Sequence, residues 1–249
     1  MRVAILVPSF NEGSNLIQLL ESLEEQLCIN PWNFTVLVIN DGSSDETIEL
    51  VDDFLGSRNK PDLEIKIVNL AFNCGVGAAM RTGYIYAHEN RFDYAIQVDA
   101  DGQHSPESID SILTGLNAGF DLVIGSRFIG NDQKLVPMHT SRRRSSVLKL
   151  VSRFISKACG QQISDATSGF RGVNSSLIEL FSKEYPSEYL GDTLDSILLV
   201  REKGFSIKDV PVVMKPRLSG ERSQNRFRST LFLCRALLNI SLFAIARKS

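Results

Sequence analysis

Residues 3–27 read VAILVPSFNEGSNLIQLLESLEEQL, and this stretch decides the fold. Its first five residues are apolar and rich in β-branched side chains, which is typical of a short buried strand. A polar segment, Pro-Ser-Phe-Asn-Glu-Gly, ends the strand. Apolar side chains then recur at helical spacing, at Leu16, Leu19, Leu20, Leu23 and Leu27. The stretch therefore predicts a strand, a loop and a helix in succession.

The same order of strand, polar loop and helix recurs along the next hundred residues. Further strands are expected at 34–39, 65–70, 94–98 and 122–125, and further helices at 47–55, 78–90 and 105–118. Ser105 should cap the last of these helices, with Pro106 at its first position. Successive strand–helix units require a parallel sheet with right-handed crossovers. The first half of the chain is thus expected to be an α/β domain of a nucleotide-binding type.

The pattern changes after Arg127. We expect a basic loop, a turn at 168–172, a late strand at 206–214, and helices at about 145–159, 175–181 and 192–203. The last stretch is apolar, with Arg228, Arg235 and Asn239 near one face, which indicates an amphipathic helix. It has about 16 to 18 suitable residues, whereas a membrane span needs about 20. A membrane-surface helix and a core or subunit-contact helix are equally compatible with this pattern.

These patterns divide the chain into a main α/β domain and a C-terminal amphipathic extension. The main domain is expected over residues 1–226, with the strand–helix units at 1–127 as its first half and residues 128–226 as its second half. The extension is expected over residues 227–249.

Composition excludes several classes of protein. The 249 residues are 43% hydrophobic and 22% charged, which is ordinary for a globular protein, and the net charge of −2 gives no general attraction to nucleic acid. The cysteines are scattered without a CxxC pair, so neither a zinc ribbon nor a disulfide framework is indicated. The apolar N-terminal run is too short for a signal peptide. A cytoplasmic protein is expected.

Polar clusters follow the predicted strands, and parallel strands bring such clusters to one edge of the sheet. The most informative is Asp99-Ala-Asp101 after an apolar strand, because two alternate carboxylates at a strand end can hold Mg²⁺ or Mn²⁺ with diphosphate oxygens. Such a cation would neutralise the charge on a departing nucleoside diphosphate.

A glycine loop, Asn73-x-Gly75-x-Gly77, follows the third strand. It is either a tight turn that allows close helix packing or a place where backbone approaches a nucleotide. Arg81, one helical turn later, could face phosphate. No GxGxxG follows the first strand, which disfavours a dinucleotide-binding oxidoreductase.

Five segments resemble, in order and spacing, the successive motifs of family 2 glycosyltransferases of GT-A fold. They are VPSFNEGSNL (7–16), VINDGSSDET (38–47), NCGVGAAMRTGY (73–84), QVDADGQHSPESI (97–109) and VIGSRF (123–128). Three later segments narrow the likeness to the branch similar to dolichyl- and polyprenyl-phosphate sugar transferases: DATSGFRGV (165–173), GFSIKDVPV (204–212) and RLSGERS (217–223). The resemblance covers nearly the whole chain.

The resemblance implies inverting transfer from a nucleoside-diphosphate sugar. Residues 1–127 would be the nucleotide-sugar-binding half of the main domain and residues 128–226 the acceptor-binding half. Asp101 should be the direct metal ligand, while Asp99 sits nearer the ribose or a metal-bound water. The sugar should lie beside Gln103 and His104, and the diphosphate near Arg81. The base and ribose should lie near Pro8, Phe10, Glu12 and Asp41. Asn73 and Gly75 are the remaining expected donor-binding residues.

Two carboxylates are candidates for the catalytic base. Many relatives have a Glu-Asp pair at a helix start, whereas this chain reads Leu-Gly-Asp-Thr-Leu-Asp, so both Asp192 and Asp195 stay open. A polyprenyl-phosphate acceptor would arrive ionised, which makes a strong general base less necessary. Its phosphate would be bound by arginines, for which Arg171, Arg217 and Arg222 are the expected residues, with Arg142 to Arg144 as further cations.

We expect a peripheral enzyme at the cytoplasmic face of a membrane, acting on a lipid-linked or cell-surface glycan. Attachment would come from the terminal helix or a small membrane partner, and a homo-oligomer is a further option. One alternative is a non-catalytic nucleotide-sugar-binding subunit of a glycan-assembly complex. Another is a nucleotidyltransferase, which usually has a glycine- and lysine-rich loop where this chain has Pro-Ser-Phe-Asn-Glu.

Overall fold

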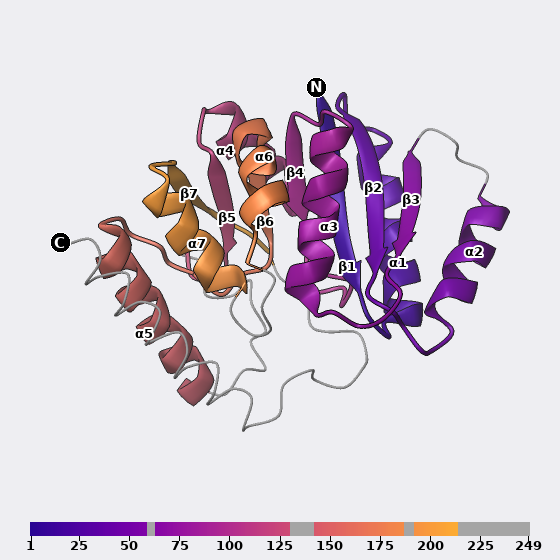
Figure 1. Ribbon diagram of the computed structural model, residues 1–249, viewed down its shortest axis with the longest axis horizontal. Helices are drawn as coiled ribbons and strands as arrows, with labels where there is room; N and C mark the ends of the chain where they lie inside the picture. Colours follow the sequence, from indigo (N-terminus) through magenta and orange to yellow (C-terminus); the bar gives the residue numbers. More distant parts are fainter. Residues whose placement is uncertain (59–62, 130–141, 187–191, 214–249) are drawn as a thin grey trace.

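The computed structural model describes residues 1–58, 63–129, 142–186 and 192–213 (Figure 1). The expected amphipathic helix at 227–249 lies outside these ranges, as do Arg217 and Arg222. Side chains are described for these residues except 142–147, for which only the helical backbone is described.

Within the described residues, one seven-stranded sheet has the order β3-β2-β1-β4-β6-β5-β7. Its strands are β1 (Arg2–Ser9), β2 (Asn33–Asn40), β3 (Glu64–Asn69), β4 (Tyr94–Gln97), β5 (Leu122–Ser126), β6 (Arg171–Asn174) and β7 (Ile207–Pro211). Pairing is parallel from β3 through β4 and between β5 and β7, while β6 runs antiparallel to both of its neighbours. The mainly parallel α/β sheet expected from the sequence is confirmed.

Strand β6 corrects the sequence prediction, which gave only a turn at 168–172. The strand has four residues, Arg-Gly-Val-Asn, and so lacks the apolar run or alternation that marks a strand. Its register places Arg171 beside Gln97 and Gly172 beside Ile96. A β-carbon on Gly172 would lie 2.4 Å from Ile112, so only glycine fits at this central position.

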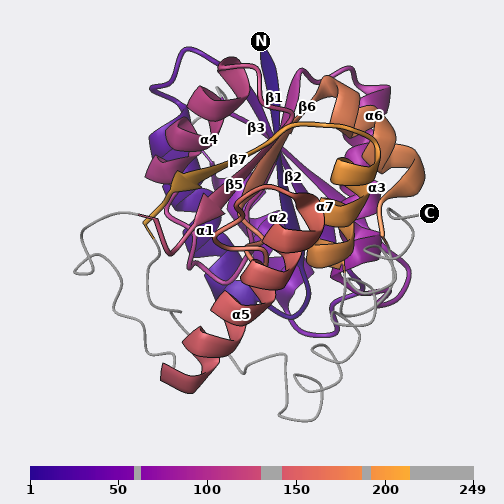
Figure 2. The same cartoon turned by 90° about the vertical axis from the view of Figure 1, so that its left-hand side faces the viewer.

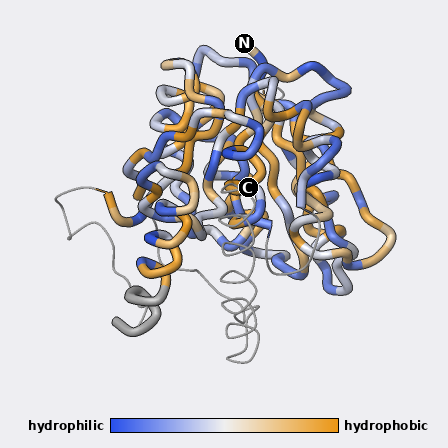
Figure 3. Tube along the Cα trace, turned by 60° about the vertical axis from the view of Figure 1, so that its left-hand side comes forward, coloured by the Kyte–Doolittle hydropathy of each residue, from blue (hydrophilic) through white to orange (hydrophobic). Residues whose placement is uncertain are grey.

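Helices cover both faces of the sheet (Figures 1 and 2). They are α1 (Gly13–Leu27), α2 (Thr47–Ser57), α3 (Val76–Glu89), α4 (Ile109–Asn117), α5 (Arg142–Cys159), α6 (Ser175–Glu184) and α7 (Asp192–Glu202). Alternate residues of β1 point to opposite faces. Val3, Ile5 and Val7 join the core with α1 and α4, whereas Ala4 and Leu6 join the core with α3, α6 and α7. Figure 3 shows the resulting apolar segments running through the middle of the molecule.

The start of α4 differs from its prediction. Ser105 makes no side-chain capping bond, and a short 3₁₀ turn over Pro106–Ser108 precedes the helix. The turn closes through the Ser108 amide, which donates to the Ser105 carbonyl at 2.9 Å. The proline is therefore at the first position of this turn, and the α-helix itself begins only at Ile109.

The carboxyl ends of β1, β2, β3 and β4 meet at one edge of the sheet because these strands are parallel. Backbone bonds continue the ladder past the strand ends: Asp41 donates to Ser9 at 2.8 Å, and Val98 donates to Leu6 at 2.9 Å. The polar segments that follow the strands therefore start from fixed positions at the same edge.

Candidate active site

The Asp99 turn follows β4 and is held by its own side chains. Gln97 Nε2 donates to Asp99 Oδ1 at 2.9 Å, and the Gln103 amide donates to Asp101 Oδ1 at 3.1 Å. Gly102 has φ +71°, a left-handed conformation suited to glycine. The Asp99 side chain keeps 37% of its surface exposed, and Asp101 is half-buried. Both carboxylates are thus placed at the sheet edge within reach of solvent.

His104 packs beneath the Asp99 turn, between Phe170 and the Asp99 backbone. Its ring is 4% exposed and stacks on Phe170, with ring centroids 4.9 Å apart. Its Nδ1 accepts from the Asp99 amide at 3.0 Å, which places the proton of the neutral ring on Nε2, 3.8 Å from Asp99 Oδ2. His104 thus orients Asp99, and its expected place beside the sugar stays a prediction.

Gly169 makes room for the Asp99 carboxylate. A β-carbon at Gly169 would lie 2.6 Å from Asp99 Oδ2 and 3.1 Å from Gln97 Nε2. The segment that enters β6 therefore lies directly against Asp99, and glycine is required for this approach. The sequence motif SGFR contains this glycine, but its contact with Asp99 depends on the unpredicted strand β6.

Asp192 is the buried carboxyl group of the site. It is the first residue of α7, is 6% exposed, and has its pKa raised to about 6. Burial is the main cause; the nearby charge of Arg171 opposes it, and the charge of Asp99 adds to it. The Tyr185 hydroxyl donates to Asp192 Oδ2 at 3.3 Å. Asp192 therefore shares an electrostatic environment with Asp99, while Asp195 lies one turn further along α7 and is half-buried.

Arg171 differs from its prediction as an acceptor-binding residue. It is 0% exposed, and its guanidinium donates to the Ser168 carbonyl at 2.6 Å, the Thr193 carbonyl at 3.2 Å and Ser196 Oγ at 2.9 Å. These bonds connect β6 to the first turn of α7. An acceptor cannot reach a side chain that is fully buried, so Arg171 acts by positioning α7 and by lowering the pKa of Asp192.

An ion pair that the sequence analysis did not identify joins β5 to the segment before β6. Arg127 donates through Nε to Asp165 Oδ2 at 2.6 Å and through Nη2 to Asp165 Oδ1 at 2.7 Å, and Asp165 is 0% exposed. Nη2 also donates to Thr167 Oγ1 at 2.9 Å. Arg127 belongs to the motif VIGSRF and Asp165 to the motif DATSGFRGV. Their opposite charges were the only feature of the sequence that could have indicated this ion pair.

Asp41 fixes the loop that follows β3. It is 3% exposed, and its two carboxylate oxygens accept from the amides of Cys74 at 2.7 Å and Gly75 at 2.8 Å. Asn73 Oδ1 also accepts from Gly75, at 3.1 Å. Gly75 has φ +90°, a conformation that suits glycine in a tight turn, and the approach of this backbone to a nucleotide stays a prediction. Asp41, Asn73 and Gly75 are thus brought together as one unit.

The other expected nucleoside-binding residues lie along the same edge. Pro8 is half-buried and pairs with Ile39 in the β-ladder, while Phe10 is 42% exposed. Glu12 accepts from Asn15 Nδ2 at 2.8 Å. Phe72 was not predicted, yet it is 70% exposed directly before the glycine loop. Exposed aromatic faces at this edge are suited to stacking against a planar base.

Arg81 is engaged away from the carboxylates. Its Nη2 donates to the carbonyl of Lys183, in the last turn of α6, at 3.0 Å. This bond joins α3 to the end of α6, where unpaired carbonyls attract cations. The structure therefore gives Arg81 a helix-packing role, and its expected contact with diphosphate remains a prediction.

The donor groups at the Asp99 turn fit a hard divalent cation. Carboxylate oxygens are the ligands that Mg²⁺ and Mn²⁺ prefer, and Mg²⁺ usually takes one or two carboxylates together with substrate phosphates. Within the described residues, no cluster of three or more histidine, cysteine or acidic side chains could hold a metal by itself. A cation at Asp99 and Asp101 would therefore depend on phosphate oxygens for further ligands.

Among the helices of the described part of the chain, none combines the length and apolar character needed to cross a membrane.

Comparison with known proteins gives consistent results in sequence and structure. The family model described as Glycosyl transferase family 2 matches residues 4–181. Polyprenol monophosphomannose synthase from Mycolicibacterium smegmatis is 27% identical, over 93% of this chain and 84% of that protein. Undecaprenyl-phosphate mannosyltransferase from Micrococcus luteus is 27% identical, over 100% of this chain and 96% of that protein.

A solved structure shares the fold at lower sequence identity. Glucosyl-3-phosphoglycerate synthase from Mycobacterium tuberculosis, in complex with Mn²⁺, uridine diphosphate and phosphoglyceric acid, superposes with a TM-score of 0.69. The identity is 14%, and the match covers 98% of this chain and 78% of the other. At this identity the likeness concerns the fold, which is the GT-A fold that the sequence motifs predict.

Proposed function

The chain belongs to glycosyl transferase family 2, and from this premise we propose that it moves a sugar, with inversion, from a nucleoside diphosphate to a polyprenyl phosphate. The observation that carries the proposal is the placement of a buried carboxyl group, Asp192, within electrostatic reach of Asp99 at the carboxyl edge of the sheet. The names of two relatives, which refer to polyprenol and undecaprenyl phosphate, support the class of acceptor.

The donor would occupy the edge formed by the loops after β1, β2 and β3. The exposed rings of Phe10 and Phe72 would stack against the base, and the loop fixed by Asp41 would line its ribose. Asp101, with Asp99, would hold Mg²⁺ or Mn²⁺, which when bound neutralises the charge of the departing nucleoside diphosphate. The Mn²⁺ and uridine diphosphate in the synthase from Mycobacterium tuberculosis support this assignment.

Asp192 would act on the acceptor. In a direct displacement with inversion, a base would remove the proton that the attacking phosphate monoester still carries when it is only singly ionised, and a base works best when its pKa lies near the operating pH. Burial raises the pKa of Asp192 to about 6, so the group is ionised at neutral pH yet basic enough to take a proton. Arg171, the Tyr185 hydroxyl and the helix start hold the group in place. Asp192 is therefore our choice over Asp195.

The acceptor would approach from the side of α5 and α7. Contacts of Arg217 and Arg222 with the acceptor phosphate stay predictions. The attachment of residues 227–249 to the cytoplasmic face of a membrane also stays a prediction. Such a peripheral arrangement suits a lipid-borne acceptor, because the reacting phosphate lies at the membrane surface.

A product assay tests the proposal. The full-length protein is incubated with UDP-, GDP- or dTDP-sugars, Mn²⁺ and a short-chain polyprenyl phosphate, and the glycolipid and the released nucleoside diphosphate are quantified. Asp192→Asn should lower kcat about 10²- to 10⁴-fold, the range for a general base. Asp101→Ala should abolish metal-dependent turnover.

Glu107→Gln is the matched control, because Glu107 is an exposed carboxylate that follows the same turn. It should leave kcat unchanged. A wild-type protein that binds a nucleotide sugar but releases no nucleoside diphosphate with any acceptor would instead be a non-catalytic subunit. Full activity of Asp192→Asn would remove Asp192 from the mechanism.

A further inference from the structure

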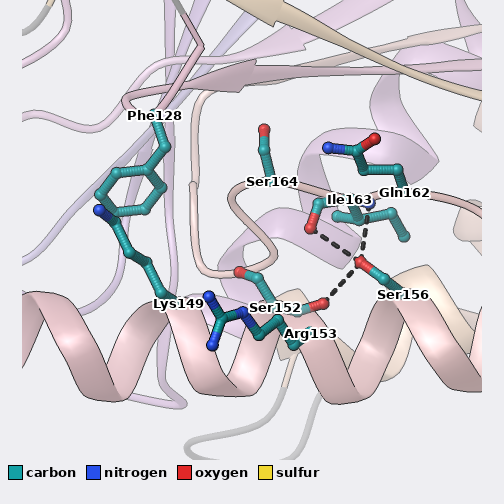
Figure 4. Close-up of a pocket in the computed structure, with 8 residues that line it drawn as sticks. All are labelled: Phe128, Lys149, Ser152, Arg153, Ser156, Gln162, Ile163 and Ser164. Atoms are coloured by element: carbon teal, nitrogen blue, oxygen red, sulfur yellow. Dashed lines mark hydrogen bonds between the residues drawn. The ribbon is translucent and has the colours of Figure 1, made fainter.

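Side-chain hydrogen bonds join neighbouring segments in two parts of the molecule that differ in exposure. Beside α5, the Ser156 hydroxyl donates to the Ser152 carbonyl at 2.7 Å and accepts from the Ile163 amide at 2.9 Å (Figure 4). Both of these bonds are half-buried, so they help to hold the segment after α5 against the helix. The bonds of the second part are exposed and lie at the sheet edge where the donor would bind.

Asn11 joins the loop after β1 to the loop after β2. Its Oδ1 accepts from the Ser44 amide at 2.8 Å, and its own amide donates to Ser43 Oγ at 3.0 Å. Further along the chain, the Gly13 amide donates to Thr47 Oγ1 at 3.1 Å. Two loops from separate strand–helix units are therefore held side by side through polar side chains.

The backbone of Asn11 has a left-handed conformation, with φ +54°. Within the described residues, Asn11 shares a positive φ with only one other non-glycine residue, Arg91. Asparagine adopts this conformation more readily than most residues because its short polar side chain can bond locally. Asn11 directly follows Phe10, whose ring is 42% exposed, and stands two residues before the start of α1. Its conformation therefore fixes how the chain leaves Phe10.

The loop after β2 also contacts the loop after β3. Gly42 has φ +66°, and a β-carbon there would lie 2.6 Å from the carbonyl carbon of Phe72. The carboxylate of Asp41 accepts from the amides of the glycine loop that follows Phe72. The exposed rings of Phe10 and Phe72 are thus connected through one intervening loop, which Asn11 holds on one side and Asp41 on the other.

We propose that Asn11 is a positioning residue for the nucleoside of the donor, because it fixes the ring of Phe10 relative to that of Phe72 before the donor binds. The inference rests on the proposed function, which places the base against these two rings. A binding site that is already ordered avoids the entropic cost of ordering its loops around the ligand. Loss of the Asn11 bonds should therefore weaken nucleotide binding. Because these bonds are exposed, their loss should change the stability of the fold little.

Calorimetric titration of the full-length protein with UDP, GDP and dTDP in the presence of Mn²⁺ tests this role without an acceptor. Asn11→Gly keeps the left-handed backbone accessible and removes the acceptor of the Ser44 amide. It should weaken binding of the nucleotide that the wild-type protein prefers about tenfold. The midpoint of urea unfolding should stay close to that of the wild-type protein.

Ser156→Ala is the matched control, because Ser156 also joins two segments through its side chain but lies beside α5. Its half-buried bonds should make it the opposite case. The midpoint of urea unfolding should fall, since the Ile163 amide loses its acceptor, while nucleotide affinity should change less than about twofold. Opposite responses of the two variants separate positioning of the donor from general support of the fold.

Amide hydrogen exchange of the unliganded protein provides a readout that needs no nucleotide. At short labelling times, Asn11→Gly should speed exchange in the peptide that covers residues 41–47, because the Ser44 amide loses its acceptor. Exchange in helix α5 should match that of the wild-type protein. Unchanged exchange at 41–47 would mean that Asn11 does not hold the loop after β2, which contradicts the inference.

A double-mutant cycle tests whether the two bonds of Asn11 act together. Ser43→Ala removes the acceptor of the Asn11 amide, and Asn11→Gly removes the acceptor of the Ser44 amide. If the bonds hold the loops as one unit, loss of either releases both loops. The double variant should then lose less affinity than the product of the two separate losses. Fully additive losses would count against a single unit.

The outcomes also separate this inference from the proposed function. A wild-type protein that binds a nucleoside diphosphate, together with wild-type affinity in Asn11→Gly, overturns the role of Asn11 and leaves the donor site standing. Parallel losses of affinity and unfolding midpoint in Asn11→Gly assign Asn11 to the support of the fold and overturn the role as well. A wild-type protein that binds none of the three nucleotides overturns the donor site itself, and the role of Asn11 with it.

Discussion

The loops after β2 and β3 hold their buried carboxylate differently from the segments around β5 and β6. Asp41 is 3% exposed and accepts from two backbone amides of the neighbouring loop. Asp165 is 0% exposed and pairs with the guanidinium of Arg127. A carboxylate held by amides leaves no charge behind when it is removed, whereas a carboxylate held by a cation does. The second region is therefore more sensitive to loss of a single side chain.

The largest effect is expected at Asp165. Asp165→Ala would leave Arg127 without its partner, and breaking a buried ion pair from one side costs about 3–5 kcal/mol. Urea denaturation followed by circular dichroism measures the free energy of unfolding. The double variant Asp165→Ala/Arg127→Met should recover part of the loss. A loss below about 1 kcal/mol would mean that water replaces Asp165 effectively.

Asp41→Ala should have a smaller effect on the same measurement. It leaves two amides of the glycine loop without their acceptor, at about 1–3 kcal/mol for a buried unsatisfied group. Because both lost contacts are to backbone, Asp41→Asn should retain part of the stability through its remaining carbonyl. If Asp41→Ala destabilises the protein as much as Asp165→Ala does, the contrast between the two regions fails.

Two glycines allow a further comparison. Gly169→Ala would press a β-carbon to 2.6 Å from the Asp99 carboxylate, whereas Gly56, in helix α2, has nothing within 4 Å. We expect Gly169→Ala to cost about 1–3 kcal/mol and to lower activity, since Asp99 must move. Gly56→Ala should be neutral or stabilising by about 0.5–1 kcal/mol. Thermal unfolding and the product assay, run on both variants, provide the test.

The smallest effect is expected at Tyr185. Its hydroxyl donates to Asp192 and so favours the ionised form, which means that Tyr185→Phe should raise the pKa of Asp192 above about 6. Activity that needs ionised Asp192 falls as pH decreases through this pKa, so the acidic limb of the kcat profile should move to higher pH. A profile that keeps its position while kcat falls would indicate a purely structural role for Tyr185.

The two regions of the sheet also differ in how well the sequence predicts them. The strand–loop–helix units of the first half follow from local apolar patterns, and the structure confirms them with small changes at their ends. Strand β6, the burial of Arg171 and the Arg127–Asp165 pair were not predicted, because each depends on contacts between residues far apart in the chain. A four-residue strand that contains an arginine and a glycine has no local signal.

In the candidate site, too, features with a local sequence pattern could be predicted and features that depend on tertiary contacts could not. The Asp99 turn was predicted from two carboxylates after an apolar strand, which is a local pattern. The choice between Asp192 and Asp195 was left open, since both occupy the first turn of one helix. Only the tertiary placement of that helix, with Tyr185 and Arg171 against its first residue, separates the two. Helix α5 also begins earlier than expected, at Arg142 rather than near Ser145.

The position of β6 between β4 and β5 has a consequence for synthesis on the ribosome. Strands β1 to β4 can assemble as soon as residue 97 has emerged, but the free edge of β4 is completed only by residues 171–174. Until then the nascent chain presents an unpaired apolar strand edge, which is a recognised starting point for aggregation. Chaperone contact during translation should therefore concentrate on the interval between these two strands.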